Sequence, residues 1–143
     1  MYGNTSMSGR GARNAYVDNA VATASPERLL VMLCDRLVLD VQRGVAALRG
    51  GTPGEAHSQL VHAQEVVTHL RSTLRVEGWD GGPGLASLYD WLHAQLVQAN
   101  IRKDAALAEG CLSLAQDLAS TWREAALQAA AATPAIAAPT AVG

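Results

Sequence analysis

The side chains with the greatest potential for chemistry are the four histidines of this chain, His57, His62, His69 and His93. His62, Glu65 and His69 share one face of a predicted helix, an arrangement that would suggest a zinc site. The two imidazoles are seven residues apart, however, which separates them by about 10 Å of helical rise. A single zinc ion holds nitrogen ligands at about 2 Å and cannot join them. We therefore expect no metal and no other cofactor.

Other catalytic patterns are missing from the sequence. It contains no Cys-x-x-Cys pair, no P-loop, no dinucleotide-binding fingerprint and no Gly-x-Ser-x-Gly elbow. Five aspartates of the helical patterns lie near an arginine or a predicted helix end, where caps and surface ion pairs are the usual roles. These aspartates are Asp35, Asp40, Asp90, Asp104 and Asp117. The sequence therefore predicts a protein that is not an enzyme.

Composition narrows the class of protein further. The 143 residues fit one domain, and 49% are apolar although phenylalanine is absent, so the core must be aliphatic. The net charge is −2 and the basic residues are scattered, which argues against a nucleic-acid partner. No apolar stretch approaches the roughly 20 residues that cross a bilayer, and no secretory signal is visible. We expect a cytoplasmic protein without membrane insertion, in which Cys34 and Cys111 are free thiols.

The chain divides into three regions by composition. We predict a flexible N-terminal arm over residues 1–22, a helical bundle over 23–131 and a disordered Ala/Pro tail over 132–143. The bundle contains four helical patterns of similar length joined by short breaks. Such patterns predict an all-α fold, an antiparallel up-down-up-down four-helix bundle.

Helix ends are well marked. We expect Ser25 to be the N-cap of the first helix and Pro26 to be its first residue. The helix then ends at Arg49, before Gly50-Gly51. Thr52 with Glu55 has the capping-box spacing for the second helix, whose inward face is the stripe Ala56, Leu60, Ala63, Val67, Leu70 and Leu74. A Gly-rich loop follows at 78–84, and Asp104 can cap the fourth helix.

The first helix has more apolar surface than one core interface needs. From Leu29 to Val41 its apolar side chains cover roughly 200° of the helix circumference, whereas a stripe of about 100° is enough to face a core. Two interpretations remain open. Bundles leave scattered apolar residues exposed, and these need no explanation. Alternatively, the surplus forms a long apolar groove for another helix.

Several short motifs occur in a characteristic order along the chain. Ala15-Tyr16 precedes the run Thr23–Arg36, which reads Thr-Ala-Ser-Pro followed by spaced leucines and Met-Leu-Cys-Asp. Leu88-Tyr89-Asp90-Trp91 lies in the third pattern, and the later motifs are Ala99-Asn100 with Lys103-Asp104 and Thr121-Trp122. Together these motifs resemble the FliS family of flagellar export chaperones. The departures are Cys34 and Trp91, where the family usually has tyrosine, and the Gly-rich loop.

The resemblance implies a helical bundle that binds the C-terminal segment of flagellin, prevents premature polymerisation and aids export. That segment would fold as a helix in an apolar groove, and Tyr16 of the arm would cover part of the groove when flagellin is absent. Other flagellar assembly proteins are further candidate partners, and the free protein would be a monomer or weak dimer. The candidate flagellin contacts are Tyr16, Leu29, Met32, Leu33, Leu88, Tyr89, Leu92, Leu96, Leu112 and Trp122. The alternative is a homo-oligomeric structural bundle that uses its surplus apolar surface for self-association.

Overall fold

The computed structural model describes residues 24–132, which form four helices and, over that range, no strand. The helices are α2 (Pro26–Arg49), α3 (Pro53–Thr73), α4 (Gly82–Arg102) and α5 (Ala105–Ala132). The predicted all-α fold is confirmed, and α2 has the bounds expected from its sequence. The predicted N-terminal arm and all but the first residue of the predicted tail lie outside the described residues.

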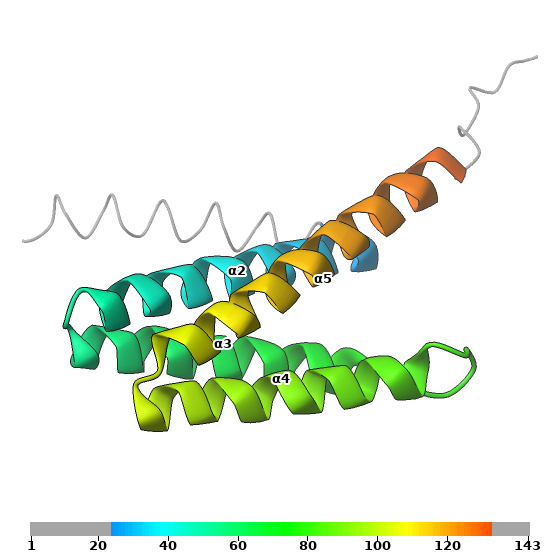
Figure 1. The fold of residues 1–143 in the computed structure, drawn as a ribbon. Coiled ribbons are helices and arrows are strands. Elements are labelled where there is room, and N and C mark those ends of the chain that lie inside the picture. Colours follow the sequence, from blue (N-terminus) through cyan, green and yellow to red (C-terminus); the bar gives the residue numbers. More distant parts are fainter. Residues whose placement is uncertain (1–23, 133–143) are drawn as a thin grey trace, which may run out of the picture.

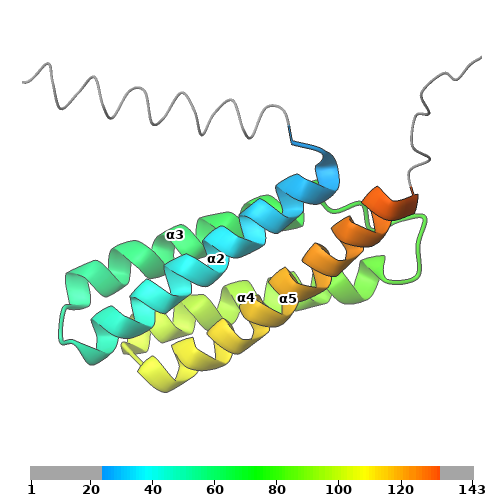
Figure 2. The same cartoon turned by 90° about the horizontal axis from the view of Figure 1, so that it is seen from above.

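Each helix packs against two others: α2 against α3 and α5, and α4 against α3 and α5. The colours in Figure 1 run in opposite directions along successive helices, as expected of an up-down-up-down bundle. Figure 2 shows the start of α2, the end of α5 and the α3–α4 loop at the same end of the bundle. We call this end the open end, because the last turns of α5 are exposed there.

The helix ends show which capping predictions hold. Ser25 caps α2, since its hydroxyl oxygen accepts a hydrogen bond from the Arg28 N–H at 3.2 Å. The Asp104 carboxylate similarly accepts from the Leu107 N–H at 3.0 Å at the start of α5. These contacts satisfy amides that the first helical turn leaves without a partner.

The predicted capping box at Thr52 is wrong. The Thr52 hydroxyl donates to the Ala47 carbonyl at 3.2 Å instead of accepting from α3, and the Glu55 carboxylate accepts from the Gln59 side chain at 3.0 Å. The Thr52 N–H also donates to Ala47, so the loop satisfies the free end of α2 before α3 begins. Gly51, with φ of 75°, makes this tight reversal possible.

The core is aliphatic, as composition predicts, with Tyr89 as its largest fully buried side chain. At Gly44 the backbone of α2 approaches α3 closely, because a Cβ atom there would lie 2.8 Å from Leu60 Cδ2. Val66 lies outside the stripe predicted for the second helix but is buried. The reason is that α3 packs against both α2 and α4, so its apolar face is wider than one stripe.

Two further properties concern the described helices. None of those between residues 24 and 132 combines the length and the hydropathy of a membrane-spanning segment. Cys34 and Cys111 are both buried and form no disulfide, which agrees with the prediction of free thiols.

Candidate functional site

The candidate site surrounds Leu29–Leu33, the first apolar segment of α2. Its side chains, Leu29, Leu30, Val31, Met32 and Leu33, are all partly exposed. Deeper along the same helix, Cys34, Leu37 and Val41 are fully buried. The Leu29–Leu33 segment therefore has an apolar pattern like that of a core segment but lies at the open end, where the other helices cover it incompletely.

The larger hollow on this segment is the α2–α5 groove, with a volume of about 430 Å³. Its apolar lining comes from Val31 and Met32 of α2 and from Ala126, Leu127 and Ala130 of α5. Leu127 is 67% exposed and lies beside the partly exposed Met32 and Val31 in the same groove lining. The polar lining consists of Ser25, Arg28, Asp35 and Arg123. This groove is thus an apolar trough with charged residues along its edges.

One ion pair crosses this groove. The Arg123 guanidinium of α5 donates to the Asp35 carboxylate of α2 at 2.6 Å, and both side chains are about half exposed. An exposed pair of this kind contributes little to stability, typically below about 1 kcal/mol. The pair joins α2 and α5 at the groove and leaves the apolar lining residue Leu127 exposed.

Two smaller hollows lie on the other side of the Leu29–Leu33 segment, toward α3. One, of about 160 Å³, is lined by Pro26, Leu29, Leu30, Leu33 and Thr73. The other, of about 240 Å³, has an aromatic and aliphatic lining that comprises Leu30, Leu70, Leu74, Trp79, Tyr89 and Trp122, with Thr73 and Arg75. Leu30 and Thr73 line both hollows, so the apolar surface continues from one to the other.

Cys34, Tyr89 and Trp122 lie close together near this end of the bundle. Burial raises the pKa of the Cys34 thiol to about 12, and the neighbouring Asp35 charge adds to the effect. Burial also raises the Tyr89 pKa to about 12, with a smaller contribution from Cys34, while a hydrogen bond with Trp122 opposes the rise. These groups stay protonated at neutral pH, so they offer packing surface and no reactive anion.

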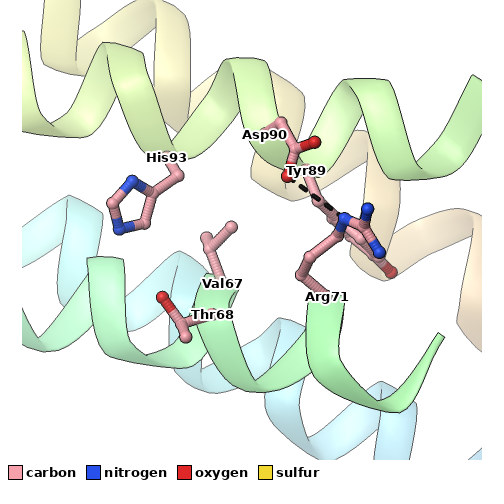
Figure 3. A pocket seen from close by; sticks show the side chains of 6 residues that line it. All are labelled: Val67, Thr68, Arg71, Tyr89, Asp90 and His93. Atoms are coloured by element: carbon pink, nitrogen blue, oxygen red, sulfur yellow. Dashed lines mark hydrogen bonds and ion pairs between the residues drawn. The ribbon is translucent and has the colours of Figure 1, made fainter.

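A more polar hollow of about 280 Å³ lies between α3 and α4 (Figure 3). Arg71 of α3 donates from Nε to the Asp90 carboxylate of α4 at 3.1 Å, at one end of the hollow. Thr68 and His93 complete its polar lining. The hollow holds neither a nucleophile paired with a base nor a set of metal ligands, so it suggests no reaction.

The most unusual polar group is Asp40, for which the sequence predicts a helix cap or a surface ion pair. Its side chain is fully buried between α2 and α3. One carboxylate oxygen contacts His62 Nδ1, and the other lies 3.0 Å from Arg36 Nε without the alignment of a hydrogen bond. The sequence signal was available, since Asp40 lies between Leu37 and Val41 on the inward face of the helix.

The helix face that carries His62, Glu65 and His69, for which the sequence predicts no metal, makes a contact with α2 instead. His62 contacts Asp40 across the α2–α3 interface. Among residues 24–132, no group of three His, Cys, Asp or Glu side chains is placed to hold a metal ion. The polar contact of this region therefore joins α2 and α3 within the fold.

The predicted flagellin contacts fall into three groups. Leu29, Met32, Leu33 and Trp122 line the hollows around the Leu29–Leu33 segment, and Tyr89, although buried, also lines the hollow of about 240 Å³. Leu88 and Leu112 are partly buried and pack against the core. Tyr89, Leu92 and Leu96 are buried in the core, because they face inward at spacings of three and four residues. Tyr16 lies outside the described residues.

Comparison with known proteins gives one consistent result. Residues 9–129 match the family model described as Flagellar protein FliS. Over 79% of its length, the chain is 30% identical to the Flagellar secretion chaperone FliS of Vibrio cholerae, of which it covers 87%. It is 32% identical to the protein of that name from Salmonella typhimurium, over 76% of this chain and 82% of the relative. The chain therefore belongs to the FliS family of flagellar secretion chaperones.

Proposed function

We propose that this protein is a cytoplasmic export chaperone that binds the C-terminal segment of flagellin, prevents its premature polymerisation and aids its export. The observation that carries the proposal is the Leu29–Leu33 segment, in which five consecutive apolar side chains remain partly exposed between hollows. Family membership supports a role in flagellar export, because the relatives are named as flagellar secretion chaperones. The segment supplies a surface suited to an apolar helix.

Binding would couple to folding of the flagellin segment. A disordered chain that becomes helical loses conformational entropy, which costs several kcal/mol of the gross interaction energy. Continuous apolar contact must compensate for this loss. The α2–α5 groove offers such contact through Met32 and Leu127, and its edges carry Arg28, Asp35 and Arg123 for polar contacts. An amphipathic helix with a Leu/Met face and a mixed-charge border would match it.

The N-terminal arm would regulate access to the same surface. We propose that Tyr16 occupies one of the hollows beside the Leu29–Leu33 segment when flagellin is absent. Replacing Tyr16 with alanine is then expected to lower the stability of the free protein, because a buried ring is lost. An unchanged midpoint of urea unfolding for Tyr16→Ala would contradict this role of the arm.

The central experiment is calorimetric titration of the protein with a peptide of about forty residues from the C-terminus of flagellin. One-to-one binding with a strongly negative heat-capacity change is expected, because apolar surface is buried as the peptide folds. Met32→Glu is expected to weaken binding at least tenfold, since it places a charge in the α2–α5 groove. Gln42→Glu is the matched control, an exposed residue on the same helix that gains the same charge.

Two outcomes would contradict the proposal. Equal affinity in Met32→Glu and Gln42→Glu would show that the groove is not the binding surface. No binding of the peptide to the unaltered protein, together with a stable dimer in light scattering, would favour the structural bundle that self-associates.

A further inference from the structure

The loop between α3 and α4, at the open end of the bundle, holds an exposed tryptophan in a fixed position (Figure 2). Trp79 is 46% exposed. Its indole Nε1–H donates to the Arg75 carbonyl at 2.7 Å, and its own carbonyl accepts from the Gly82 N–H at 3.2 Å. Because the indole N–H already has its hydrogen-bond partner within the loop, the exposed part of the ring offers apolar surface.

Two glycines allow the loop to pack closely around this ring. A Cβ atom on Gly81 would lie 2.2 Å from Trp79 Cζ3, and a Cβ atom on Gly82 would lie 2.1 Å from the Val76 carbonyl oxygen. Carbon atoms in van der Waals contact are about 3.5–4.0 Å apart, so a side chain at position 81 would push the indole out of its place. The Gly-rich sequence, one of the departures from the family pattern, therefore fixes the position of the indole.

The fixed ring forms one side of the hollow of about 240 Å³. The lining contains three aromatic rings, those of Trp79, Tyr89 and Trp122. A cavity of about 150 Å³ is enough for a benzene-sized molecule, so this hollow has room for one large side chain. Arg75 is the one charged residue of the lining, and it forms no ion pair within residues 24–132. Its charge therefore disfavours a lysine or an arginine as the occupant.

We propose that Trp79 is a specificity-determining residue for flagellin, and that the hollow beside it receives one large uncharged apolar side chain of the flagellin segment. This inference rests on the proposed function, since the occupant belongs to the helix that binds the Leu29–Leu33 segment. Leu30 and Thr73 line both this hollow and the smaller one of about 160 Å³ on that segment. A helix that lies along the segment can therefore insert a side chain between Leu30 and Trp79.

A ring that is fixed before binding suits this role. Tryptophan is enriched among the residues that contribute most to binding energy, and a side chain that is already ordered loses little conformational entropy on binding. Trp91 of α4 has a similar exposed fraction, 52%, but lines none of the hollows around the Leu29–Leu33 segment. The two tryptophans are therefore a matched pair, alike in exposure and different in position.

The first test is calorimetric titration of the full chain with the flagellin peptide. Trp79→Ala is expected to weaken binding about tenfold or more, as the loss of a central aromatic contact usually does. Trp91→Ala is the matched control and is expected to bind the peptide like the unaltered protein. Helical circular dichroism of both variants verifies that each is folded.

The second test displaces the ring without removing it. Gly81→Ala places a Cβ atom against the indole, whereas the control Gly84→Ala places one in open space. Gly81 has a right-handed helical conformation with φ of −79°, so alanine adds no backbone strain there. Gly81→Ala is expected to weaken binding about threefold or more, because the preformed hollow is lost. Gly84→Ala is expected to leave the affinity unchanged.

The third test follows the indole directly, with a flagellin peptide that contains no tryptophan. Burial of an exposed indole shifts its fluorescence emission to shorter wavelength. We expect this shift on peptide binding in the unaltered protein and in Trp91→Phe, and a smaller shift in Trp79→Phe. A shift that is smaller in Trp91→Phe instead would show that the peptide covers the outer face of α4, which contradicts the inference.

Three further results would overturn the inference. One is equal affinity of Trp79→Ala and Trp91→Ala for the peptide, and another is an equal effect of Gly81→Ala and Gly84→Ala. The third is tighter binding by Trp79→Ala, which would show that a segment of the chain itself occupies the hollow and competes with flagellin. Failure of the proposed function has a different signature, because the unaltered protein would then not bind the peptide, and the inference would fail with it.

Discussion

In the second half of α2 the side chains of Leu37 and Val41 are fully buried, whereas Leu29, Leu30 and Leu33 in the first half remain partly exposed. Both halves carry apolar residues at helical spacing. They differ in what surrounds them, because α3 approaches the second half closely at Gly44 and the α2–α5 groove lies beside the first half. The comparison separates apolar residues that stabilise the fold from apolar residues that are left available for a partner.

The polar groups of the two halves differ in the same way. The second half contains the buried Asp40 with His62 and Arg36, and the first half contains the exposed Asp35 with Arg123. A buried carboxylate that loses its partner is costly, while an exposed ion pair contributes little. The second half is thus fixed by polar as well as apolar contacts.

The largest expected effect comes from shortening one leucine in each half. Leu37→Ala leaves a cavity in the core and is expected to lower the free energy of unfolding by about 3 kcal/mol. Leu33→Ala is expected to cost less than about 1.5 kcal/mol, because its side chain is already partly exposed. Urea unfolding measures both values. Equal losses would show that the two halves are buried alike in solution.

The next effect concerns the buried carboxylate. His62→Ala removes the hydrogen-bond partner of Asp40 Oδ2 and is expected to cost about 2 kcal/mol. The cost is moderated because the His62 side chain is 44% exposed and Arg36 remains near the other oxygen. Arg123→Ala, which breaks the exposed pair of the first half, is the matched control, with an expected loss below about 0.5 kcal/mol. A loss for His62→Ala no greater than this control would mean that Asp40 is hydrated in solution.

The two halves also show what sequence can and cannot predict. Helical spacing and the Ser25-Pro26 start were enough to give the length of α2, since these signals are local. The surplus apolar arc left open whether its residues form a groove or are merely scattered on the surface, and the structure places Leu29, Met32 and Leu33 at hollows. Helical spacing alone could not distinguish these three residues from inward-facing residues on other helices. Whether an apolar side chain is buried depends on which neighbouring helix packs over it.

Packing between distant segments also explains why some residues have a different role in the structure from the one that the sequence predicts. Leu92 and Leu96 were candidates by motif, and their side chains are buried in the core of the assembled bundle. His62 and Asp40 are 22 positions apart in sequence, and only the packing of α3 on α2 brings them together. Thr52 had the local signature of a cap, yet the free carbonyl of Ala47 competes for its hydroxyl. In each case a contact between distant segments decided the role of the residue.

The smallest expected effect is a loss of stability at alkaline pH. It tests whether the Cys34 thiol, which lies between the two halves, is buried. Burial raises its pKa from the ordinary 9.0 to about 12, so above pH 9 the unfolded chain loses a proton that the folded protein retains. Stability contributed by the raised pKa is present below pH 9 and is lost as pH rises toward 12, at about 1.4 kcal/mol per pH unit for one thiol.

Between pH 9 and pH 10 this loss amounts to about 1 kcal/mol for Cys34, and Cys111, whose pKa is raised to about 11, adds a comparable loss. Urea unfolding at the two pH values is expected to show a smaller decrease for Cys34→Ala than for the unaltered protein. If the Cys34 thiol were exposed in solution, its pKa would remain near 9 and Cys34→Ala would leave the decrease unchanged. A smaller decrease in the variant would instead mean that the Cys34 thiol faces the core, while its neighbours Leu33 and Asp35 line hollows on either side of it.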